Sequence, residues 1–382
     1  MPSFADYGVW DVPSGRLRFA PENWLPLEQG VAGAHGFAAL GKGMHVRWSN
    51  SVGQIASKRA ALLNDRRTVF LRSGDPIVAR AHQNKTWIGS WSGETLIESV
   101  RTGEVMLSES GKIAAIVAGD GVEVWDLTTK RWRGFATASY PHDIVLSFDG
   151  ERLAYSAGEK IVVWATAHFD RAPLLIPAVC EMAPCQSKTP YSDYRTMRPK
   201  MFCGDRLFAD LALVSAGVVL DTTTGAAVAL LDHLAAEKSH LCTRDMQQVI
   251  KLDAQWFKHY RSGLSSIAST SLASRAKVWS QTIQSLVTHL SLSPKGTRLI
   301  ASAGDELVVL NTADGKLLLT LRATENGEAS VALAPDGQVE IFGDASQVRG
   351  RLSCHIGTRV FPFELCEERL LTPGLVAGIS RE

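Results

Sequence analysis

The sequence predicts an all-β protein in which short antiparallel strands recur as a repeat. Three strings start with a Ser-x-x-Gly turn and continue with an apolar run, a small turn and a second apolar run. They are SESGKIAAIVAGDGVEVWDL (Ser108–Leu127), SFDGERLAYSAGEKIVVWAT (Ser147–Thr166) and SPKGTRLIASAGDELVVLNT (Ser293–Thr312). The first two start about 40 residues apart, which is the period of four-stranded propeller blades. A unit of three strands cannot bury its own faces, so we expect copies packed as a β-propeller.

The most regular copy is Asp143–Trp164, DIVLSFDGERLAYSAGEKIVVW. Its first strand alternates apolar and polar residues, and Asp149-Gly150 supplies the positive φ that a tight hairpin needs. A second turn at Gly158-Glu159 leads into Ile161–Trp164, which is almost wholly apolar, as in a strand covered on both faces. This stretch therefore predicts three successive antiparallel strands.

Weaker copies occupy the rest of the chain. They are His35–Lys58, Arg72–Gly103, Cys203–Leu231 and the short hairpin APDGQVEIFGD (Ala334–Asp344). The segment from Asp245 to Val287 is the hardest to assign. Lys277–Trp279 is predicted to be its third strand, whereas Met246–Tyr260 has the pattern of a short helix.

Turn glycines set the expected number of blades. Seven anchors lie near Gly36, Gly74, Gly111, Gly150, Gly204, Gly296 and Gly337. We therefore expect seven blades, and eight as the alternative, because the interval between Gly204 and Gly296 has room for one more. Tyr7–Phe19 is expected to supply the third and fourth strands of a blade whose first two strands come from Ala329–Asp344. This pairing closes the ring and removes exposed sheet edges.

The domain organisation expected from these repeats is a single propeller over residues 1–382, with an insertion between blades at 178–203 and a closing segment at 351–382. In the closing segment Val360, Phe361 and Phe363 flank Pro362. Because proline cannot donate to a central ladder, these residues suit an edge strand or a plug packed on the ring.

Trp10-Asp11 and Trp125-Asp126, each followed by a turn and an outgoing strand, together with the Ser-x-Asp-Gly hairpins, resemble the WD-repeat β-propeller family. The resemblance covers most of the chain unevenly. The Gly-His dipeptide of regular repeats is absent, and Trp164-Ala165 and Leu310-Asn311 replace Trp-Asp. The resemblance implies blades held mainly by apolar packing. The closing segment is also similar to that of propellers in bacterial signalling and protease-associated proteins, so we expect a bacterial source.

Composition limits the classes of function. The chain has 382 residues, 45% of them hydrophobic and 21% charged, with a formal net charge of +1. This balance gives no electrostatic case for nucleic acid or an anionic membrane as the partner. The N-terminal residues lack a basic region followed by an apolar one, and no apolar run is long enough to span a membrane. We therefore expect a cytoplasmic protein.

Six cysteines are present, at positions 180, 185, 203, 242, 354 and 366. In a cytoplasmic chain they are expected to be reduced, mostly buried thiols. Cys180, Cys185 and Cys203, with His240 or Cys242 as a fourth ligand, are the alternative as a metal site. Their spacing matches no zinc pattern, because zinc ligands usually come as two closely spaced pairs.

Catalytic motifs are missing from the sequence. It contains no phosphate-binding loop, no dinucleotide fingerprint, no HExxH and no nucleophile elbow. We therefore expect a protein that is not an enzyme and has no cofactor, no catalytic residue and no metal. The ten tryptophans could form an aromatic binding platform, but blade-to-blade packing is the favoured interpretation. Glu364, Glu367 and Glu368 are expected to form a solvated face.

The insertion AVCEMAPCQSKTPYSDYRTMRPKMFC (Ala178–Cys203) is the clearest break in the repeat. Long loops on a rigid scaffold often carry binding residues, and tyrosine with arginine is typical of interface hot spots. We therefore assign partner binding to Tyr191, Tyr194, Arg195 and Arg198. A solvated loop is the alternative.

Two functions fit this pattern. The first is a non-catalytic platform for protein partners, as the adaptor or sensor subunit of a bacterial multi-protein system in signalling or defence. The alternative is an enzyme or small-ligand binder that uses the central channel. It requires polar residues converging from several blades.

Overall fold

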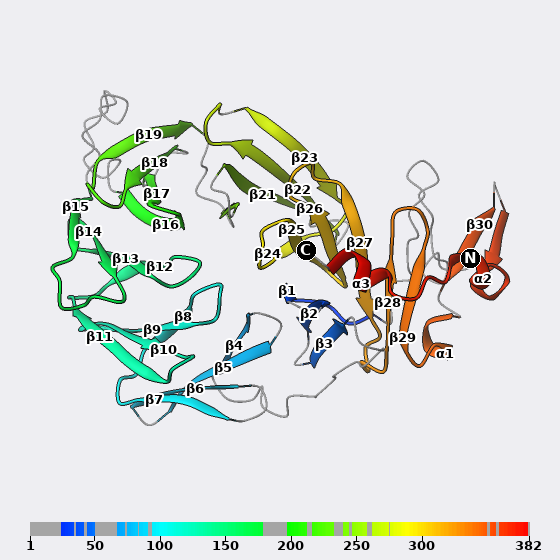
Figure 1. The fold of residues 1–382 in the computed structure, drawn as a ribbon, viewed down its shortest axis with the longest axis horizontal. Helices are drawn as coiled ribbons and strands as arrows, with labels where there is room; N and C mark the ends of the chain where they lie inside the picture. Colours follow the sequence, from blue (N-terminus) through cyan, green and yellow to red (C-terminus); the bar gives the residue numbers. More distant parts are fainter. Residues whose placement is uncertain are drawn as a thin grey trace. The chain divides into compact units, whose positions relative to one another are not determined.

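The computed structural model shows an all-β protein. The structure describes residues 24–33, 36–41, 44–49, 67–72, 75–82, 84–90, 94–178, 197–211, 216–232, 240–243, 247–257, 262–274, 276–349, 352–356 and 359–380. Its main sheets form seven propeller blades of antiparallel strands paired in sequence order (Figure 1). The predicted fold class and the predicted number of blades are confirmed.

The blades are numbered along the chain. Blade 1 contains β1 (Gln29–Gly33), β2 (Gly36–Gly41) and β3 (Met44–Ser49). Blade 2 contains β4 (Arg67–Arg72), β5 (Asp75–His82), β6 (Lys85–Ser90) and β7 (Thr95–Ser99). Blade 3 contains β8 (Glu104–Leu107), β9 (Ile113–Ala118), β10 (Gly121–Asp126) and β11 (Arg131–Thr137). Blade 4 contains β12 (His142–Leu146), β13 (Arg152–Ala157), β14 (Lys160–Ala165) and β15 (Leu174–Pro177).

The remaining blades follow the same order. Blade 5 contains β16 (Met197–Cys203), β17 (Arg206–Leu211), β18 (Ala216–Asp221) and β19 (Ala227–Asp232). Blade 6 contains β20 (His240–Cys242), β21 (Gln248–Phe257), β22 (Ser262–Ser271) and β23 (Lys277–Ile283). Blade 7 contains β24 (Val287–Leu292), β25 (Arg298–Ala303), β26 (Glu306–Asn311) and β27 (Leu317–Ala323).

One hydrogen-bonded hairpin recurs at the start of blades and explains the repeated Ser-x-x-Gly strings. At each copy a hydroxyl accepts the main-chain N–H five residues later, as Ser147 Oγ does from Arg152 at 2.9 Å. The same contact is made by Ser108, Thr243, Ser293 and Thr324. Within the turn Gly150 adopts φ +78°, which glycine tolerates without steric cost. The sequence thus specifies the turn, and the turn fixes the register of the two strands.

The chain divides into two compact units, residues 64–249 and residues 1–63 with 250–382. In residues 64–249 apolar faces of consecutive blades pack together. Ile116 of blade 3 packs with Ile88 of blade 2, Leu153 of blade 4 packs with Val124 of blade 3, and Leu207 of blade 5 packs with Ile161 of blade 4. In the other unit, the core joins blade 1, blade 7 and the C-terminal helix α3 (Leu375–Ser380).

The number of blades agrees with the prediction, but their membership differs. The segment that was hardest to assign forms blade 6. The helix predicted over Met246–Tyr260 is wrong, because β21 occupies Gln248–Phe257, and Lys277–Trp279 begins the fourth strand, β23, rather than forming the third. The hairpin at Gly337 is not a separate blade. Its strands β28 (Ala329–Leu333) and β29 (Val339–Gly343) extend the sheet of blade 7 to six strands.

The C-terminal residues pack on this extension. α1 (Ser346–Arg349), β30 (Ser353–Ile356), β31 (Arg359–Pro362), η5 (Phe363–Leu365) and α2 (Glu367–Leu370) precede α3. Phe363 is fully buried against the β28–β29 hairpin, as expected of a plug. The Glu340 carboxylate on β29 accepts the N–H groups of Gly374 and Val376 at 2.7 and 2.8 Å and so holds the start of α3.

The predicted closing strands Tyr7–Phe19 lie outside the described residues, so their pairing stays a prediction. The first described residues do contact blade 7. Leu25 donates its N–H to the carbonyl of Ala323 at 2.9 Å, and Trp24 makes an antiparallel bridge with Thr324. α3 also contacts β2 and β3 of blade 1.

Disulfides correct the expectation of reduced thiols. Cys203 is bonded to Cys242, and Cys354 to Cys366. Cys203 is therefore not available as a metal ligand in this structure, while Cys180 and Cys185 lie outside the described residues. Disulfides are typical of oxidising compartments, so they count against the cytoplasmic location, which stays a prediction. Among the described helices none is long and apolar enough to cross a membrane.

Candidate functional site

Two main-chain hydrogen bonds of Ala178 define the base of the predicted insertion. The carbonyl of Ala178 accepts the N–H of Met197 at 2.6 Å, and the N–H of Ala178 donates to the carbonyl of Glu159 at 2.8 Å. The side chains of both Ala178 and Met197 are buried in the core shared by blades 4 and 5. Residues 179–196 lie between these two fixed positions and outside the described residues, and so do Tyr191, Tyr194 and Arg195. Arg198 is the second residue of β16, directly after the base.

Five charged or titratable side chains from two neighbouring blades gather beside this base. We call His142 and Asp143 of β12, Arg198 and Lys200 of β16, and Asp210 of β17 the mixed-charge cluster. Lys200 Nζ lies 3.2 Å from Asp210 Oδ2. Asp143 Oδ2 lies 3.9 Å from Arg198 Nε and 3.7 Å from His142 Nε2. The cluster therefore spans the seam at which the first strands of blades 4 and 5 lie side by side.

Irregular strand pairing brings these side chains together. The register of β12 against β13 shifts between His142 and Val145, and that of β16 against β17 shifts between Pro199 and Met201. Asp143 and Lys200 lie within these bulges, which redirect a side chain and are common near functional sites. Asp143 also adopts φ +51°, a left-handed conformation that is uncommon outside glycine and better tolerated by Asp and Asn.

Burial and charge act in opposite directions on Asp210. Burial raises the pKa of this carboxyl above its ordinary value, the ammonium of Lys200 lowers it, and the carboxylate of Asp143 raises it further, so the net shift is upward. Asp143 also carries a desolvation cost, because its buried Oδ2 receives no hydrogen bond from any residue that the structure describes. Buried polar atoms without a hydrogen-bond partner are uncommon. This oxygen therefore has only the longer ion-pair contacts with Arg198 and His142 among the described residues.

The exposed fractions of the side chains show how charge is layered in the cluster. His142, Arg198 and Lys200 are 57, 54 and 45% exposed, whereas Asp143 and Asp210 are 26 and 12% exposed. The basic side chains therefore face solvent, and the carboxylates are more buried. Such an arrangement can hold an anionic group at the surface by charge-assisted hydrogen bonds.

Sequence reasoning predicted one member of the cluster, Arg198, as a partner-binding residue and missed the other four. Lys200 belongs to the same insertion but was not assigned a role. No sequence pattern distinguishes Asp210 as a site residue, because it lies in RLFADL, a strand with no motif. Its acidic side chain belongs to the cluster because β17 pairs with β16, which packs against β12.

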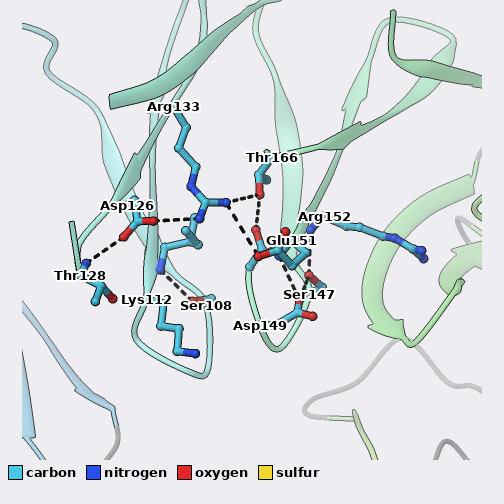
Figure 2. A network of polar contacts seen from close by, with 12 residues as sticks. Ser108, Lys112, Asp126, Thr128, Arg133, Ser147, Asp149, Glu151, Arg152 and Thr166 are labelled. Carbon is cyan, nitrogen blue, oxygen red and sulfur yellow. Dashed lines mark hydrogen bonds and ion pairs between the residues drawn. The ribbon is translucent and has the colours of Figure 1, made fainter. Parts of the chain in front are cut away.

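A second polar network joins blades 3, 4 and 5. Figure 2 shows Arg133 of β11 between Asp126 of its own blade, at 2.8 Å, and Thr166 of blade 4, at 3.2 Å. The Thr166 hydroxyl in turn donates to the carbonyl of Gly150 at 2.5 Å. Asp126, the aspartate of the Trp-Asp dipeptide, also accepts the N–H groups of Thr128 and Thr129 at 3.0 Å.

Arg152 continues the connection into blade 5. Its guanidinium donates to the carbonyl of Gly204 at 3.1 Å and to the Thr222 hydroxyl at 2.6 Å, and it also forms an ion pair with Asp205. These contacts are internal and satisfied, so we assign this network to structure. The mixed-charge cluster, by contrast, has exposed cations and an unsatisfied carboxylate oxygen, and it is the candidate site.

The fold defines a class: the chain is a β-propeller with seven blades, and its Trp125-Asp126 turn resembles that of a WD repeat. No protein-family model and no curated protein matches the chain. Solved structures that resemble it include a chain of a mitotic checkpoint complex, at 14% identity and a TM-score of 0.42, covering 68% of this chain and 81% of that one.

Two further structures show a similar degree of likeness. The hydrazine synthase of Kuenenia stuttgartiensis has 12% identity and a TM-score of 0.43, covering 73% of this chain and 95% of that one. The β-propeller domain of Cps50 (Swd1) from Myceliophteria thermophila has 12% identity and a TM-score of 0.45, covering 70% of this chain and 92% of that one. At these values the likeness supports no statement about function.

Proposed function

We propose that the protein is a non-catalytic interaction platform, in which rigid blades present the insertion and the mixed-charge cluster to a protein partner. The observation that carries the proposal is the position of Arg198. It lies one residue beyond the hydrogen bond that closes the base of the insertion, and its guanidinium is more than half exposed. The base of the insertion therefore adjoins the cluster.

The partner-binding roles of Tyr191, Tyr194, Arg195 and Arg198 belong to this proposal. Tyrosine and arginine supply large contact areas and directional hydrogen bonds, and they dominate interface hot spots. We place the protein as an adaptor or sensor subunit of a bacterial multi-protein system. Its domain organisation in this proposal is one propeller over 1–382, with the insertion at 178–203 and the closing segment at 351–382.

The geometry of the base allows a clean removal of the insertion. Because the Ala178 carbonyl already accepts the Met197 N–H, replacing residues 179–196 with a Pro-Gly pair places these two residues at the ends of a β-turn with the same hydrogen bond. The variant keeps Arg198 and both buried anchor side chains. Its thermal unfolding should match the wild type within about 2 °C, since the removed residues are replaced by a compatible turn.

The test is co-purification from the cells of origin, with the retained proteins measured by quantitative mass spectrometry. We expect a partner that is retained by the wild type and by Arg171→Glu, an exposed control in blade 4, and is lost from the Pro-Gly variant. The proposal fails if the wild type retains no partner. Equal retention by the wild type and the Pro-Gly variant would remove the insertion from the proposal.

A second candidate function is supported by the acid–base chemistry of the cluster. Asp210 has a raised pKa and lies 3.2 Å from the Lys200 ammonium, and perturbed groups of this kind are enriched at small-ligand and catalytic sites. Binding or turnover of a small ligand is therefore the alternative. A screen that identifies a metabolite raising the melting temperature of the wild type, but not that of Lys200→Gln, would favour this alternative.

A further inference from the structure

We propose that the mixed-charge cluster, together with Tyr140, is a docking surface for an acidic peptide segment in which carboxylate side chains stand next to an apolar residue. This inference rests on the proposed platform function and names the chemistry of its partner. It depends only on described residues at the seam of blades 3, 4 and 5.

The first argument concerns the donors that Arg198 leaves available. Its ion-pair partner is Asp143, and 3.9 Å separates Arg198 Nε from the Asp143 Oδ2 atom, beyond hydrogen-bonding distance. A guanidinium presents a planar fork of donors that matches a carboxylate with two parallel hydrogen bonds. An incoming carboxylate can therefore bind Arg198 without breaking a hydrogen bond within the described part of the chain.

The second argument concerns the other cations of the surface. Lys200 has three donor hydrogens, and its described ion pair with Asp210 engages one oxygen of that residue. His142 adds a third nitrogen-bearing side chain that faces solvent. The surface layer is thus complementary to negative charge.

The third argument is an exposed aromatic side chain two residues before His142. Tyr140 is 80% exposed, which is unusual for a large aromatic residue in this chain, and it adopts φ +50°. Its N–H donates to the carbonyl of Gly119 at 2.9 Å, and its own carbonyl contacts His142 Nδ1 at 3.2 Å. These contacts fix the backbone on both sides of the ring. The exposed ring above this fixed backbone offers an apolar surface to a residue next to the carboxylate.

An acidic peptide fits better than single-stranded nucleic acid, the other polymer that combines negative charge with stacking groups. A phosphate chain needs a continuous cationic track. Here each cation stands next to a carboxylate, and the chain as a whole has a net charge of only +1. The separate carboxylates of a peptide suit a surface on which cations and carboxylates alternate. Each can bind one cation and remain away from Asp143 and Asp210.

The test is the selection of a random peptide library displayed on phage against the intact protein. We expect the selected peptides to be enriched in Asp and Glu next to an aromatic or aliphatic residue. The dissociation constant of the best peptide is then measured by fluorescence anisotropy. Replacing its carboxylates with amides should weaken binding by about tenfold or more, and raising the salt concentration should weaken it too, as expected of exposed charge pairs.

Variants of the protein locate the binding surface. We expect Arg198→Gln to weaken binding of the peptide by about tenfold, because a hot-spot arginine is replaced by a neutral group. Arg198→Glu should weaken binding more, because its carboxylate repels those of the peptide. Tyr140→Asn removes the ring while keeping a residue that tolerates positive φ, and should also weaken binding. Arg171→Glu is the matched control and should bind as the wild type does. Thermal unfolding of each variant shows that it is folded.

The outcomes separate this inference from the platform proposal. Selected peptides that lack acidic enrichment, or that bind Arg198→Gln and Arg198→Glu as tightly as the wild type, overturn the acidic-peptide inference and leave the platform intact. Tighter binding of a labelled single-stranded oligonucleotide than of the best peptide at the same salt concentration also overturns it. A library from which no peptide is selected above background counts against both.

Discussion

The indole N–H of Trp279 in blade 6 donates a hydrogen bond to the main-chain carbonyl of Thr312 in blade 7, at 2.7 Å. The ring also fills the space above Gly315, where an added Cβ would lie 2.5 Å from Trp279 Cε3. A buried tryptophan thus joins two blades through packing and one hydrogen bond. This relationship supports the interpretation of this tryptophan as a blade-packing residue.

We predict that Trp279→Phe lowers the free energy of unfolding by about 1–3 kcal/mol, because the Thr312 carbonyl loses its donor in a buried position. Gly315→Ala should cost about 1–2 kcal/mol for the left-handed backbone and more for the clash with the ring. Gly158→Ala is the matched control, since Gly158 has φ +58° but no atom within 4 Å of the added Cβ. Chemical denaturation measures all three. Equal losses for Gly315→Ala and Gly158→Ala would contradict the packing role of Trp279.

The contacts of Arg152 lead to a second prediction. Arg152→Ala should destabilise the protein by about 1–2 kcal/mol, because the Gly204 carbonyl and the Thr222 hydroxyl lose a charged donor. Asp205→Ala should cost less than about 0.5 kcal/mol, since Asp205 is 74% exposed and its ion pair is screened by solvent. Urea unfolding of both variants and of the double variant gives the two costs and their coupling. A larger loss for Asp205→Ala than for Arg152→Ala would show that the ion pair, rather than the two neutral acceptors, stabilises the seam.

The raised pKa of Asp210 predicts a pH dependence of stability. Since the folded protein holds this proton more tightly than the unfolded chain, stability falls as the pH rises from the ordinary value of 3.8 through the raised folded value. Asp210→Asn cannot titrate, so the stability of the wild type relative to this variant should decrease through that window and then become constant. Urea unfolding at several pH values from 3.5 upward measures this difference.

Asp221→Asn supplies a control of opposite sign. Hydrogen bonds from the N–H groups of Thr224 and Thr223 lower the pKa of Asp221, so its contribution to stability is present above the ordinary value of 3.8 and is lost as the pH falls through the lowered folded value. The wild type should therefore gain stability relative to Asp221→Asn as the pH rises. The same slope for both variants would exclude the burial of Asp210 as the cause of its shift.

The two disulfides predict a dependence on reducing agents. In the chain-entropy model, Cys203–Cys242 closes a loop of 39 residues, worth about 4 kcal/mol. Cys354–Cys366 closes one of 12 residues, worth about 3 kcal/mol. Reduction should therefore lower the melting temperature, and Cys203→Ser should be more destabilising than Cys354→Ser. Alkylation followed by mass spectrometry of the unreduced protein should leave these four cysteines unlabelled. Labelling of all four in the folded protein would instead support the reduced thiols expected from the sequence.

The sequence by itself determined the all-β class and the repeated blade unit, because these depend on local chemistry. A hydroxyl that accepts the N–H five residues later, a glycine with positive φ and two apolar runs specify the hairpin at Ser147 wherever it lies in the chain. The aspartate of Trp125-Asp126 likewise closes its own turn through Thr128 and Thr129. Such interactions connect residues within a few positions of each other, so a reader of the sequence can find them.

Only the tertiary structure decided which segments share a sheet and which side chains share a site. β21 has a helical pattern in sequence, yet pairing within blade 6 makes it a strand, and β28–β29 extends blade 7 because its edge was available for pairing. Asp143 and Asp210 come from different blades, and no local pattern relates them. Their proximity depends on the packing of β12 against β16 and on two bulges, which are long-range effects that hydrophobic periodicity does not encode.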